Sequence, residues 1–365
     1  MQRTDDKYWA EYDGLQHAKH QILRSYLGGW FPILGSWQGR VLYIDCHAGR
    51  GRHQAGEEGS PIIALRLLLE HKARKRILSG TEIHFYFFEI DDLNFRRLKK
   101  EIRGLGDLPD NVVVHPHFGD YEGYLSEAIA DLKKKDQQMA AAFAFVDPYG
   151  FSISMRFLNE VLQFPATELF VNFMYRWVDM AIRHPGHVDN MNSLFDTSEW
   201  RELLGIDDPD RRSQAAIDLF GSQLRAEHVT HIYMRGANNA LKYVLFHATN
   251  HRKGRELMKS SIWSVTPDGS FSASERDSPN QPVLITAEPD FGPLEDALWN
   301  KFGGTTVKSA RMDRWLVDQL YLPKHLHDIL REYRKRDWVA VSDYDPPFSF
   351  GQNPTFRFPK KRPSQ

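Results

Sequence analysis

The chain lacks the features that mark secreted and membrane proteins. It has a single cysteine, Cys46, in 365 residues, so it forms no intramolecular disulfide and a cysteine-rich metal site is not expected. No apolar run reaches the length of about 18 residues that a membrane-spanning helix needs. Residues 1–14 are polar and lack the apolar core of a signal peptide. We therefore expect a cytoplasmic protein.

An excess of charge of one sign is also lacking. The 47 Lys and Arg balance 48 Asp and Glu, for a net charge of −1, so no global field draws in nucleic acid or acidic lipid. A nucleic-acid partner would need a local basic patch. The composition is 41% hydrophobic and 26% charged, which is ordinary for a globular protein. At about 100–200 residues per domain, the length predicts two domains.

Short apolar runs alternate with amphipathic stretches over the first half of the chain. The predicted strands are 41–45, 83–90, 111–121, 141–150 and 167–175. The predicted helices are 17–34, 60–76, 91–105, 124–135 and 155–164. We expect Gly28-Gly29 to end the first helix and Ser60 to cap the second. This alternation predicts an α/β fold, a Rossmann-like parallel sheet with helices on both faces.

The pattern changes after Tyr175. Residues 176–227 read as a helical insertion, and two strands joined by Ala-Asn-Asn then form a predicted hairpin. Residues 266–291 are rich in Pro, Ser, Gly and Asp and are predicted to be a linker. Three short helices and two strands follow in 292–365, which favours a winged-helix domain. The first domain would therefore be 1–265.

Acidic residues stand where the predicted strands end. They are Asp45, Glu89, Asp120 and Asp147. Ligands of open α/β sheets bind at the carboxyl ends of the strands. Gly49 and Gly51 follow the first strand and let a ligand approach the backbone closely. A plain tight turn is the alternative interpretation of these glycines.

Each of these positions suits one part of S-adenosylmethionine. A carboxylate at Glu89 would bind the ribose hydroxyls, and Asp120 would accept from the adenine amino group. The loop reads D-x-x-A-G-x-G, which differs from the dinucleotide motif G-x-G-x-x-G and lacks the G-K-[ST] of a P-loop. We predict a class I methyltransferase with this cofactor. Its predicted cofactor-binding residues are Asp45, His47, Ala48, Gly49, Gly51, Glu89, Ile90, Asp120 and Asp147.

Residues 147–150 read Asp-Pro-Tyr-Gly and resemble the D-P-P-[YF] motif of methyltransferases that modify the amino groups of bases. The resemblance implies that Asp147 and the carbonyl of Pro148 accept hydrogen bonds from the target amino group, while Tyr149 or Phe151 stacks on the base. These four residues are the predicted catalytic set. A duplex base must be flipped out to reach such a pocket. An Asp-Pro turn that only ends a strand is the alternative.

The chain resembles the three-Cys-motif partner protein (TcmP) family over most of 17–300. The resemblance rests on several short stretches. They are Lys19-His20 with ILRSYL, DCHAGRG at 45–51, GSPIIAL at 59–65, FFEID at 87–91, FVDPYGFS at 145–152, VNFMY at 171–175, FDTSEWREL at 195–203 and TNHRKGRELMKSSIW at 249–263. It implies a class I methyltransferase fold with a helical insertion and a radical-SAM-like partner protein that carries the three cysteines.

One departure from that family bears on the substrate. Family members usually read D-G-F-A-G-P-G where this chain reads D-C-H-A-G-R-G. The D-x-H-A-G-x-G form resembles a family of ribosomal-RNA adenine-N6 methyltransferases and favours adenine N6 as the target.

The favoured function is methyl transfer from S-adenosylmethionine to a nucleic-acid base. The predicted substrate-binding residues are Lys19, His20, Asn172, Tyr175, Arg334 and Lys335. No metal is expected, because no acid or cysteine pattern accompanies His84, His115 and His117. Two alternatives remain: a non-catalytic subunit that binds nucleic acid or a partner, and a methyltransferase for small molecules or proteins.

Overall fold

The computed structural model describes residues 9–10, 12–35, 39–276 and 288–363 and forms two compact units. The N-terminal unit comprises Met1–Val265 with Phe271–Val283, and the C-terminal unit comprises Thr266–Ser270 with Leu284–Gln365. Residues 277–287 of the predicted linker lie outside the described residues. In the described ranges, no helix is both long and apolar enough to cross a membrane.

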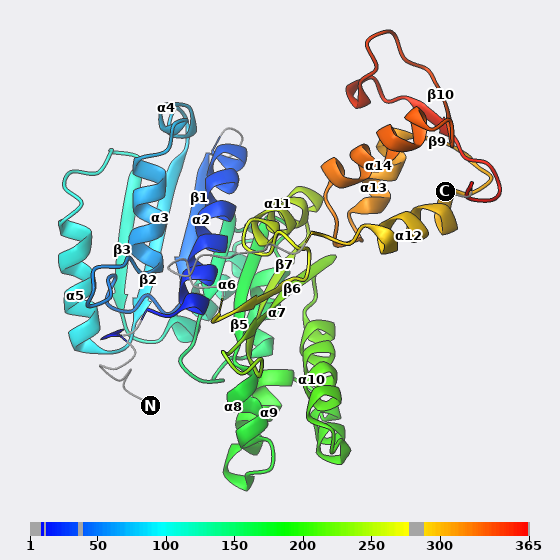
Figure 1. Cartoon of the computed structure of the whole chain (residues 1–365). Coiled ribbons are helices and arrows are strands. Elements are labelled where there is room, and N and C mark those ends of the chain that lie inside the picture. Colours follow the sequence, from blue (N-terminus) through cyan, green and yellow to red (C-terminus); the bar gives the residue numbers. More distant parts are fainter. Residues whose placement is uncertain (1–8, 11, 36–38, 277–287, 364–365) are drawn as a thin grey trace. The chain divides into compact units, whose positions relative to one another are not determined.

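An eight-stranded sheet forms the centre of the N-terminal unit (Figure 1). Its strands are β1 (Arg40–Asp45), β2 (Glu82–Glu89), β3 (Val112–Phe118), β4 (Ala141–Val146), β5 (Thr167–Phe173), β6 (His228–Arg235), β7 (Leu241–Thr249) and β8 (Ser272–Ser274). The spatial order is β3-β2-β1-β4-β5-β7-β6-β8. Only β7 of these strands runs against its neighbours, β5 and β6. The predicted parallel sheet and the hairpin are confirmed.

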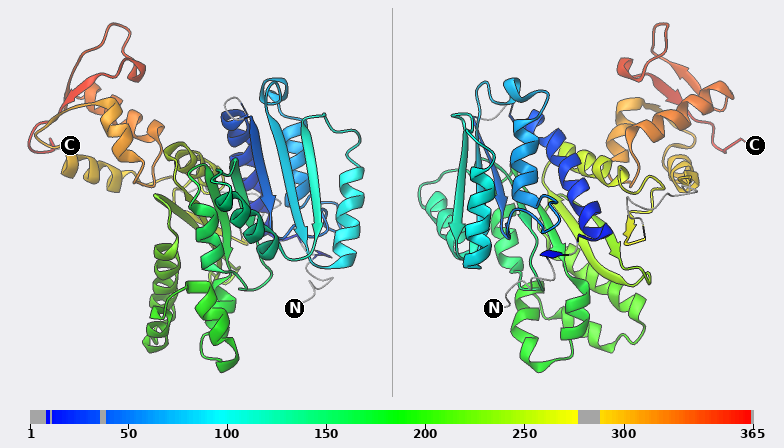
Figure 2. Two further views of the ribbon diagram at one scale, coloured as in Figure 1. Left: turned by 180° about the vertical axis from the view of Figure 1, so that it is seen from behind. Right: turned by 60° about the vertical axis from the view of Figure 1, so that its left-hand side comes forward.

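Helices cover both faces of this sheet (Figure 2). The described helices of this unit are α2 (Gly14–Leu34), α3 (Ser60–Leu69), α4 (Arg74–Ile77), α5 (Asp92–Arg103), α6 (Tyr121–Lys134), α7 (Met155–Leu162), α8 (Tyr175–Ala181), α9 (Val188–Phe195), α10 (Pro209–Gln223) and α11 (Arg252–Trp263). Since side chains alternate along a strand, Tyr43 and Phe143 lie on one face, where Phe143 stacks on both Tyr43 and Tyr26 of α2. Ile44 and Ala142 belong to the core that α6 and α7 close on the other.

Three local predictions were wrong. Helix α2 continues through Gly28-Gly29 to Leu34, because Gly29 lets α11 approach: a Cβ there would lie 2.5 Å from Leu257 Cδ1. The second helix ends at Leu69, and Gly59 is its N-cap, while Ser60 hydrogen-bonds to Asp45. The predicted linker contributes β8, which pairs with β6.

The C-terminal unit combines helices with short strands. Its elements are α12 (Gly292–Phe302), β9 (Thr306–Lys308), α13 (Ser309–Leu316), α14 (Pro323–Lys335), β10 (Ala340–Ser342) and β11 (Thr355–Arg357). The three strands form an antiparallel sheet in the order β10-β11-β9. Leu298, Leu326 and Phe356 are fully buried in its core. Strand β9 was not predicted, whereas two strands of this unit were.

Candidate functional site

A cavity of about 830 Å³ lies at the carboxyl ends of the central strands. It sits where the strand order reverses, because β1 lies between β2 and β4, and this is where open α/β sheets bind ligands. The volume is within the range of about 300–1,000 Å³ that small-molecule sites occupy. Residues of α2 and β7 complete its wall, among them Lys19 and Tyr243.

The turn after β1 supplies the first part of the cavity wall. His47, Ala48 and Gly49 line it. Gly49 has a φ of +64° and packs so closely on the Trp9 ring that no Cβ would fit. Gly51 does not line the cavity. Its carbonyl accepts a hydrogen bond of 2.9 Å from the Gly59 N–H, so this second glycine positions the start of α3.

Two titratable groups of this turn are perturbed by burial. Asp45 is fully buried beneath the cavity and accepts from the His47 N–H at 3.2 Å. Burial raises the pKa of Asp45 to about 7. Burial lowers the pKa of His47 to about 4, so its imidazole is neutral at neutral pH. Its Nδ1 atom has no hydrogen-bond partner among the described residues.

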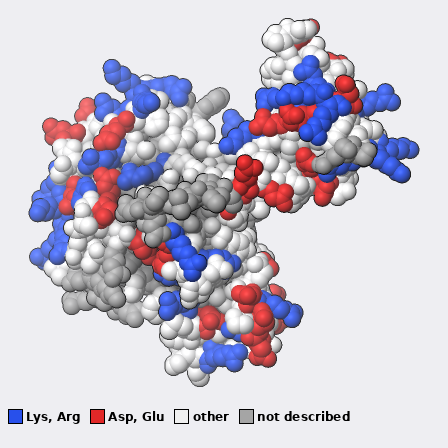
Figure 3. Space-filling model, viewed as in Figure 1, with Lys and Arg blue, Asp and Glu red and all other residues white. Residues whose placement is uncertain are grey.

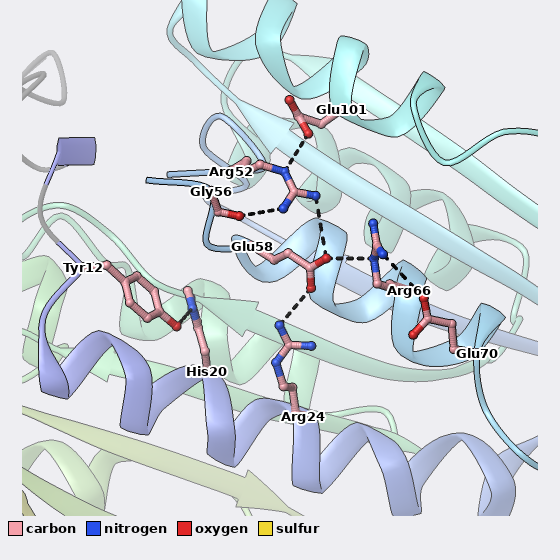
Figure 4. A network of polar contacts seen from close by, with 9 residues as sticks. All are labelled: Tyr12, His20, Arg24, Arg52, Gly56, Glu58, Arg66, Glu70 and Glu101. Atoms are coloured by element: carbon pink, nitrogen blue, oxygen red, sulfur yellow. Dashed lines mark hydrogen bonds and ion pairs between the residues drawn. The ribbon is translucent and has the colours of Figure 1, made fainter. Parts of the chain in front are cut away.

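An ion-pair network fixes the loop that leads from this turn to α3 (Figure 4). Glu58 accepts from Arg24 Nη2 at 2.9 Å and pairs with Arg66 Nε at 2.7 Å. Arg52 lies 3.7 Å from the same carboxylate and bonds Glu101 at 3.0 Å. The loop is therefore tied to α2, α3 and α5, and the glycine turn is held at the mouth of the cavity.

The acids that follow β2 and β3 also reach the cavity. Glu89 is 8% exposed, lines the cavity and accepts from the Asp91 N–H at 2.7 Å. Burial raises its pKa above the usual value for glutamate. Ile90 and Asp120 line the same wall. Asp120 accepts from the Gly123 N–H at 2.9 Å, so one of its oxygens caps α6.

Three polar side chains meet at the end of β4. Lys19 of α2 forms an ion pair with Asp147 Oδ2, and Asn172 of β5 donates to Asp147 Oδ1 at 2.6 Å. The Lys19 side chain is 4% exposed and that of Asp147 is 14% exposed. All three line the cavity. Asn172 Oδ1 has no hydrogen-bond partner in the part of the chain that the structure describes.

The structure distinguishes the two aromatic candidates for stacking. Tyr149 is 43% exposed and lines the cavity with Pro148 and Trp177, whose ring centroid lies 6.1 Å from that of Tyr149. Phe151 is 9% exposed, belongs to the core and does not line the cavity. Tyr175 does not line it either, because its hydroxyl points to Asp179 at 3.3 Å. Tyr149 is thus the aromatic that faces this space.

The other predicted substrate residues are divided between the two units. His20 lines the cavity, and Tyr12 Oη lies 2.9 Å from its Nδ1. Burial lowers the His20 pKa well below its usual value. Arg334 belongs to the C-terminal unit, where it donates to Tyr344 Oη at 3.1 Å and lies over the Phe348 ring. Lys335, in the same unit, bonds Glu332 at 2.6 Å.

Several cavity residues were not predicted. Arg176 and Trp177 lie in α8, three and four residues after β5 ends at Phe173, so a strand-end rule extended by one helical turn would have found them. Gln16 and Tyr243 also line the cavity. They come from α2 and β7, and no local motif distinguishes them from core residues.

The comparisons with known proteins give fold similarity alone. No protein-family model and no curated protein matches the chain. Among solved structures, an O-methyltransferase from Bacillus cereus in complex with SAH is 13% identical, with 62% of this chain and 80% of that one covered and a TM-score of 0.32. Protein LPL1258 from Legionella pneumophila is 13% identical, with coverages of 63% and 84% and a TM-score of 0.35.

A third structure, the methyltransferase domain of bacterial CtHen1, is 11% identical, with 62% of this chain and 99% of that one covered and a TM-score of 0.31. The fold assignment itself rests on the strand order. The order β3-β2-β1-β4-β5-β7-β6 with β7 reversed is that of Rossmann-like class I methyltransferases, and the chain has this fold.

Proposed function

We propose that the protein is an S-adenosylmethionine-dependent methyltransferase that acts on the amino group of a nucleic-acid base, with adenine N6 as the favoured target. One observation carries the proposal. Asp147, Pro148 and Tyr149 line the same cavity as Gly49 and Glu89, so the groups suited to an acceptor and those suited to the methyl donor share one space.

The residues of the cavity fit S-adenosylmethionine, which would supply the methyl group. Glu89 offers a carboxylate for ribose hydroxyls, and the unpartnered Nδ1 of the neutral His47 can exchange one hydrogen bond with a ligand. Asp120 lines the wall beside Glu89, where it suits the adenine amino group. The Gly49 turn brings backbone close to the cavity.

The acceptor side holds a base amino group by hydrogen bonds. Asp147 has lone pairs beyond those that Lys19 and Asn172 use, since a carboxylate accepts about four hydrogen bonds. An amino N–H donated to Asp147 would orient the nitrogen toward the methyl group, and the exposed Tyr149 ring would stack on the base. The contribution of the protein is orientation and proximity, and the proton lost from nitrogen would leave to water.

Membership of the TcmP family and the radical-SAM-like partner are part of the same proposal, and the motif residues at 45–51 and 145–152 support them. The proposal also includes a winged-helix identity for the C-terminal unit. Its element order, helix, strand, two helices and two strands, supports that identity.

A second function is favoured by one observation. Both carboxylate oxygens of Asp147 already have protein partners, Lys19 and Asn172. A non-catalytic subunit that keeps the fold, and binds nucleic acid or a partner protein, would show this closed arrangement.

Calorimetric titration of S-adenosylmethionine and S-adenosylhomocysteine tests the cofactor site. We expect micromolar binding that Glu89→Ala weakens at least about tenfold, because the ribose contact is lost. Glu82→Ala is the matched control, since Glu82 is an exposed residue at the opposite end of β2. Absence of binding to the wild type, or equal effects of both variants, would overturn the assignment of the cavity.

Methyl transfer then separates the two functions. RNA and DNA are incubated with radiolabelled donor, digested, and analysed for methylated nucleosides. Asp147→Ala is expected to lower transfer at least about 100-fold while donor affinity changes less than about threefold. A wild type that binds donor and nucleic acid but methylates neither RNA nor DNA would support the non-catalytic subunit.

A further inference from the structure

We propose that the C-terminal unit binds the phosphate backbone of nucleic acid on a surface formed by α13 and the outer face of its three-stranded sheet. We call this surface the α13 patch and define it by Lys308, Arg311, Arg314 and Arg357. This surface would be where the methyltransferase proposed above contacts its nucleic-acid substrate. The choice of nucleic acid as the partner rests on that proposed function.

The strand register places two of these cations side by side. Lys308 of β9 is opposite Thr355, and Arg357 is opposite Thr306. Val307 and Phe356 between them point into the core, so Lys308 and Arg357 project from the outer face. Diagonal neighbours of this kind have Cα atoms about 7–8 Å apart, close to the spacing of adjacent phosphates along one strand.

Helix α13 extends this pair. Lys308 is its N-cap residue, and Arg311 and Arg314 follow at intervals of three, so the three side chains share one side of the helix. Arg311 and Arg314 are exposed, whereas Met312 and Leu316 are buried in the core. The four cations therefore form one continuous strip.

Among the residues that the structure describes, no acid neutralises the charge of this strip through an ion pair with Lys308, Arg311, Arg314 or Arg357. Asp313, the acid inside α13, bonds His327 at 2.9 Å. Asp343 accepts from the Thr355 hydroxyl at 2.6 Å and marks the border of the patch. Exposed cations that form no ion pair with an acid are those that release counterions when they meet phosphate.

The basic residues of α14 differ in this respect. Arg331 bonds Asp328 at 2.6 Å, and Lys335 bonds Glu332 at 2.6 Å. Arg334 lies against the rings of Tyr344 and Phe348. Figure 3 shows Lys and Arg interleaved with acids on one face of the molecule, so the number of cations alone does not locate a phosphate site. Arg334 and Lys335, which the sequence predicts as substrate-binding residues, are therefore the weaker candidates for this phosphate contact.

The test compares two variants of the full chain with the same change in charge. The patch variant carries Lys308→Ala, Arg311→Ala, Arg314→Ala and Arg357→Ala. The control variant carries Lys324→Ala, Arg331→Ala, Lys335→Ala and Arg336→Ala. Fluorescence anisotropy with labelled oligonucleotides of about 20 nucleotides, both RNA and DNA and both single strands and duplexes, gives affinities from about 50 to 300 mM salt.

We expect the patch variant to bind at least about tenfold more weakly at 100 mM salt, with a salt slope reduced by roughly 2–4, since each lost phosphate contact removes about 0.7–0.9. The control is expected to change affinity less than about threefold. Thermal unfolding confirms that both variants keep a folded C-terminal unit. The order of affinities among the four oligonucleotides identifies the preferred nucleic acid.

Equal weakening of both variants, or no binding by the wild type at 50 mM salt, would overturn the proposal. Equally efficient displacement by polyglutamate would overturn it too, because the patch would then bind any polyanion. The assay contains no methyl donor, and Glu82→Ala, at an exposed position outside the cavity lining, serves as a binding-competent reference. A protein that binds through the patch without methylating would refute the enzyme function alone.

Discussion

At the scale of single residues, the orientation of Asp147 depends on contacts with side chains that lie far from its motif in the sequence. Its carboxylate receives Lys19 on one oxygen and Asn172 on the other. A buried cation removed from its partner leaves an uncompensated charge. Lys19 is therefore expected to fix the orientation of the Asp147 carboxylate, which makes it a positioning residue for the proposed acceptor site.

A double-mutant cycle tests this role. Lys19→Met is expected to lower methyl transfer at least about tenfold and stability by about 1–3 kcal/mol, the latter being a discounted value because Asp147 is partly exposed. Asp147→Asn added to Lys19→Met should restore the thermal midpoint without restoring transfer. Donor affinity by calorimetry is the control and should change less than about threefold. Unchanged transfer in Lys19→Met would contradict the positioning role.

Asp45 gives stability a specific pH dependence. Its pKa is about 7 in the folded protein, against 3.8 for the unperturbed group, chiefly because of burial. The folded state therefore binds this proton more tightly than the unfolded state. The resulting stability is fully present below about pH 4 and is lost as the pH rises to about 7, by up to about 4 kcal/mol.

Asp45→Asn should remove this slope. The measurement is the free energy of unfolding in urea at pH 5 and at pH 8. From pH 5 to pH 8, the stability of the variant relative to the wild type is expected to rise by about 1–3 kcal/mol. Asp110→Asn, at an exposed position, is the control and should leave the slope unchanged. Parallel pH profiles for Asp45→Asn and the wild type would show that Asp45 is not the group responsible.

At the scale of elements, the packing of α2 on α11 depends on one of two adjacent glycines. A Cβ at Gly28 would meet nothing within 4 Å, whereas at Gly29 it would lie 2.5 Å from Leu257 Cδ1. Gly28→Ala should raise stability by about 0.5–1 kcal/mol through helix propensity. Gly29→Ala should be about 1–3 kcal/mol less stable than Gly28→Ala because the helices must move apart.

Chemical denaturation gives the free energies of unfolding of the two variants, whose substitutions lie one position apart in the same helix. Equal stabilities would mean that Leu257 moves aside at little cost. The same helix carries Lys19, so we also expect Gly29→Ala to alter the acceptor site more than Gly28→Ala does.

At the scale of the whole molecule, the two compact units have separate cores. Leu158 lies in the core of the N-terminal unit and Leu298 in that of the C-terminal unit, and both are fully buried. We expect two calorimetric transitions. Leu158→Ala and Leu298→Ala should each lower the free energy of unfolding of their own unit by about 2–5 kcal/mol, and with it the midpoint of one transition. S-adenosylhomocysteine should raise only the midpoint that Leu158→Ala lowers. A single transition lowered by both variants would contradict this independence.

The sequence by itself determined the alternation of strands and helices, the acids at the strand ends and the Asp-Pro-Tyr-Gly turn. These features depend on periodicity and on chain order. Because parallel strands end at the same edge of the sheet, residues at the ends of successive strands lie close together there. It also predicted that Gly49 and Glu89 belong to one site for the methyl donor, and in the structure both residues line the same cavity.

Tertiary structure decided the rest. It placed the Tyr149 ring at the surface of the cavity and the Phe151 ring in the core. It carried α2 through two glycines, since α11 packs against the second of them, Gly29. It also joined Asp147 to Lys19, which is 128 residues away along the chain. Pairings of this kind arise from helix–sheet packing and leave no local period, so a sequence read in windows does not contain them.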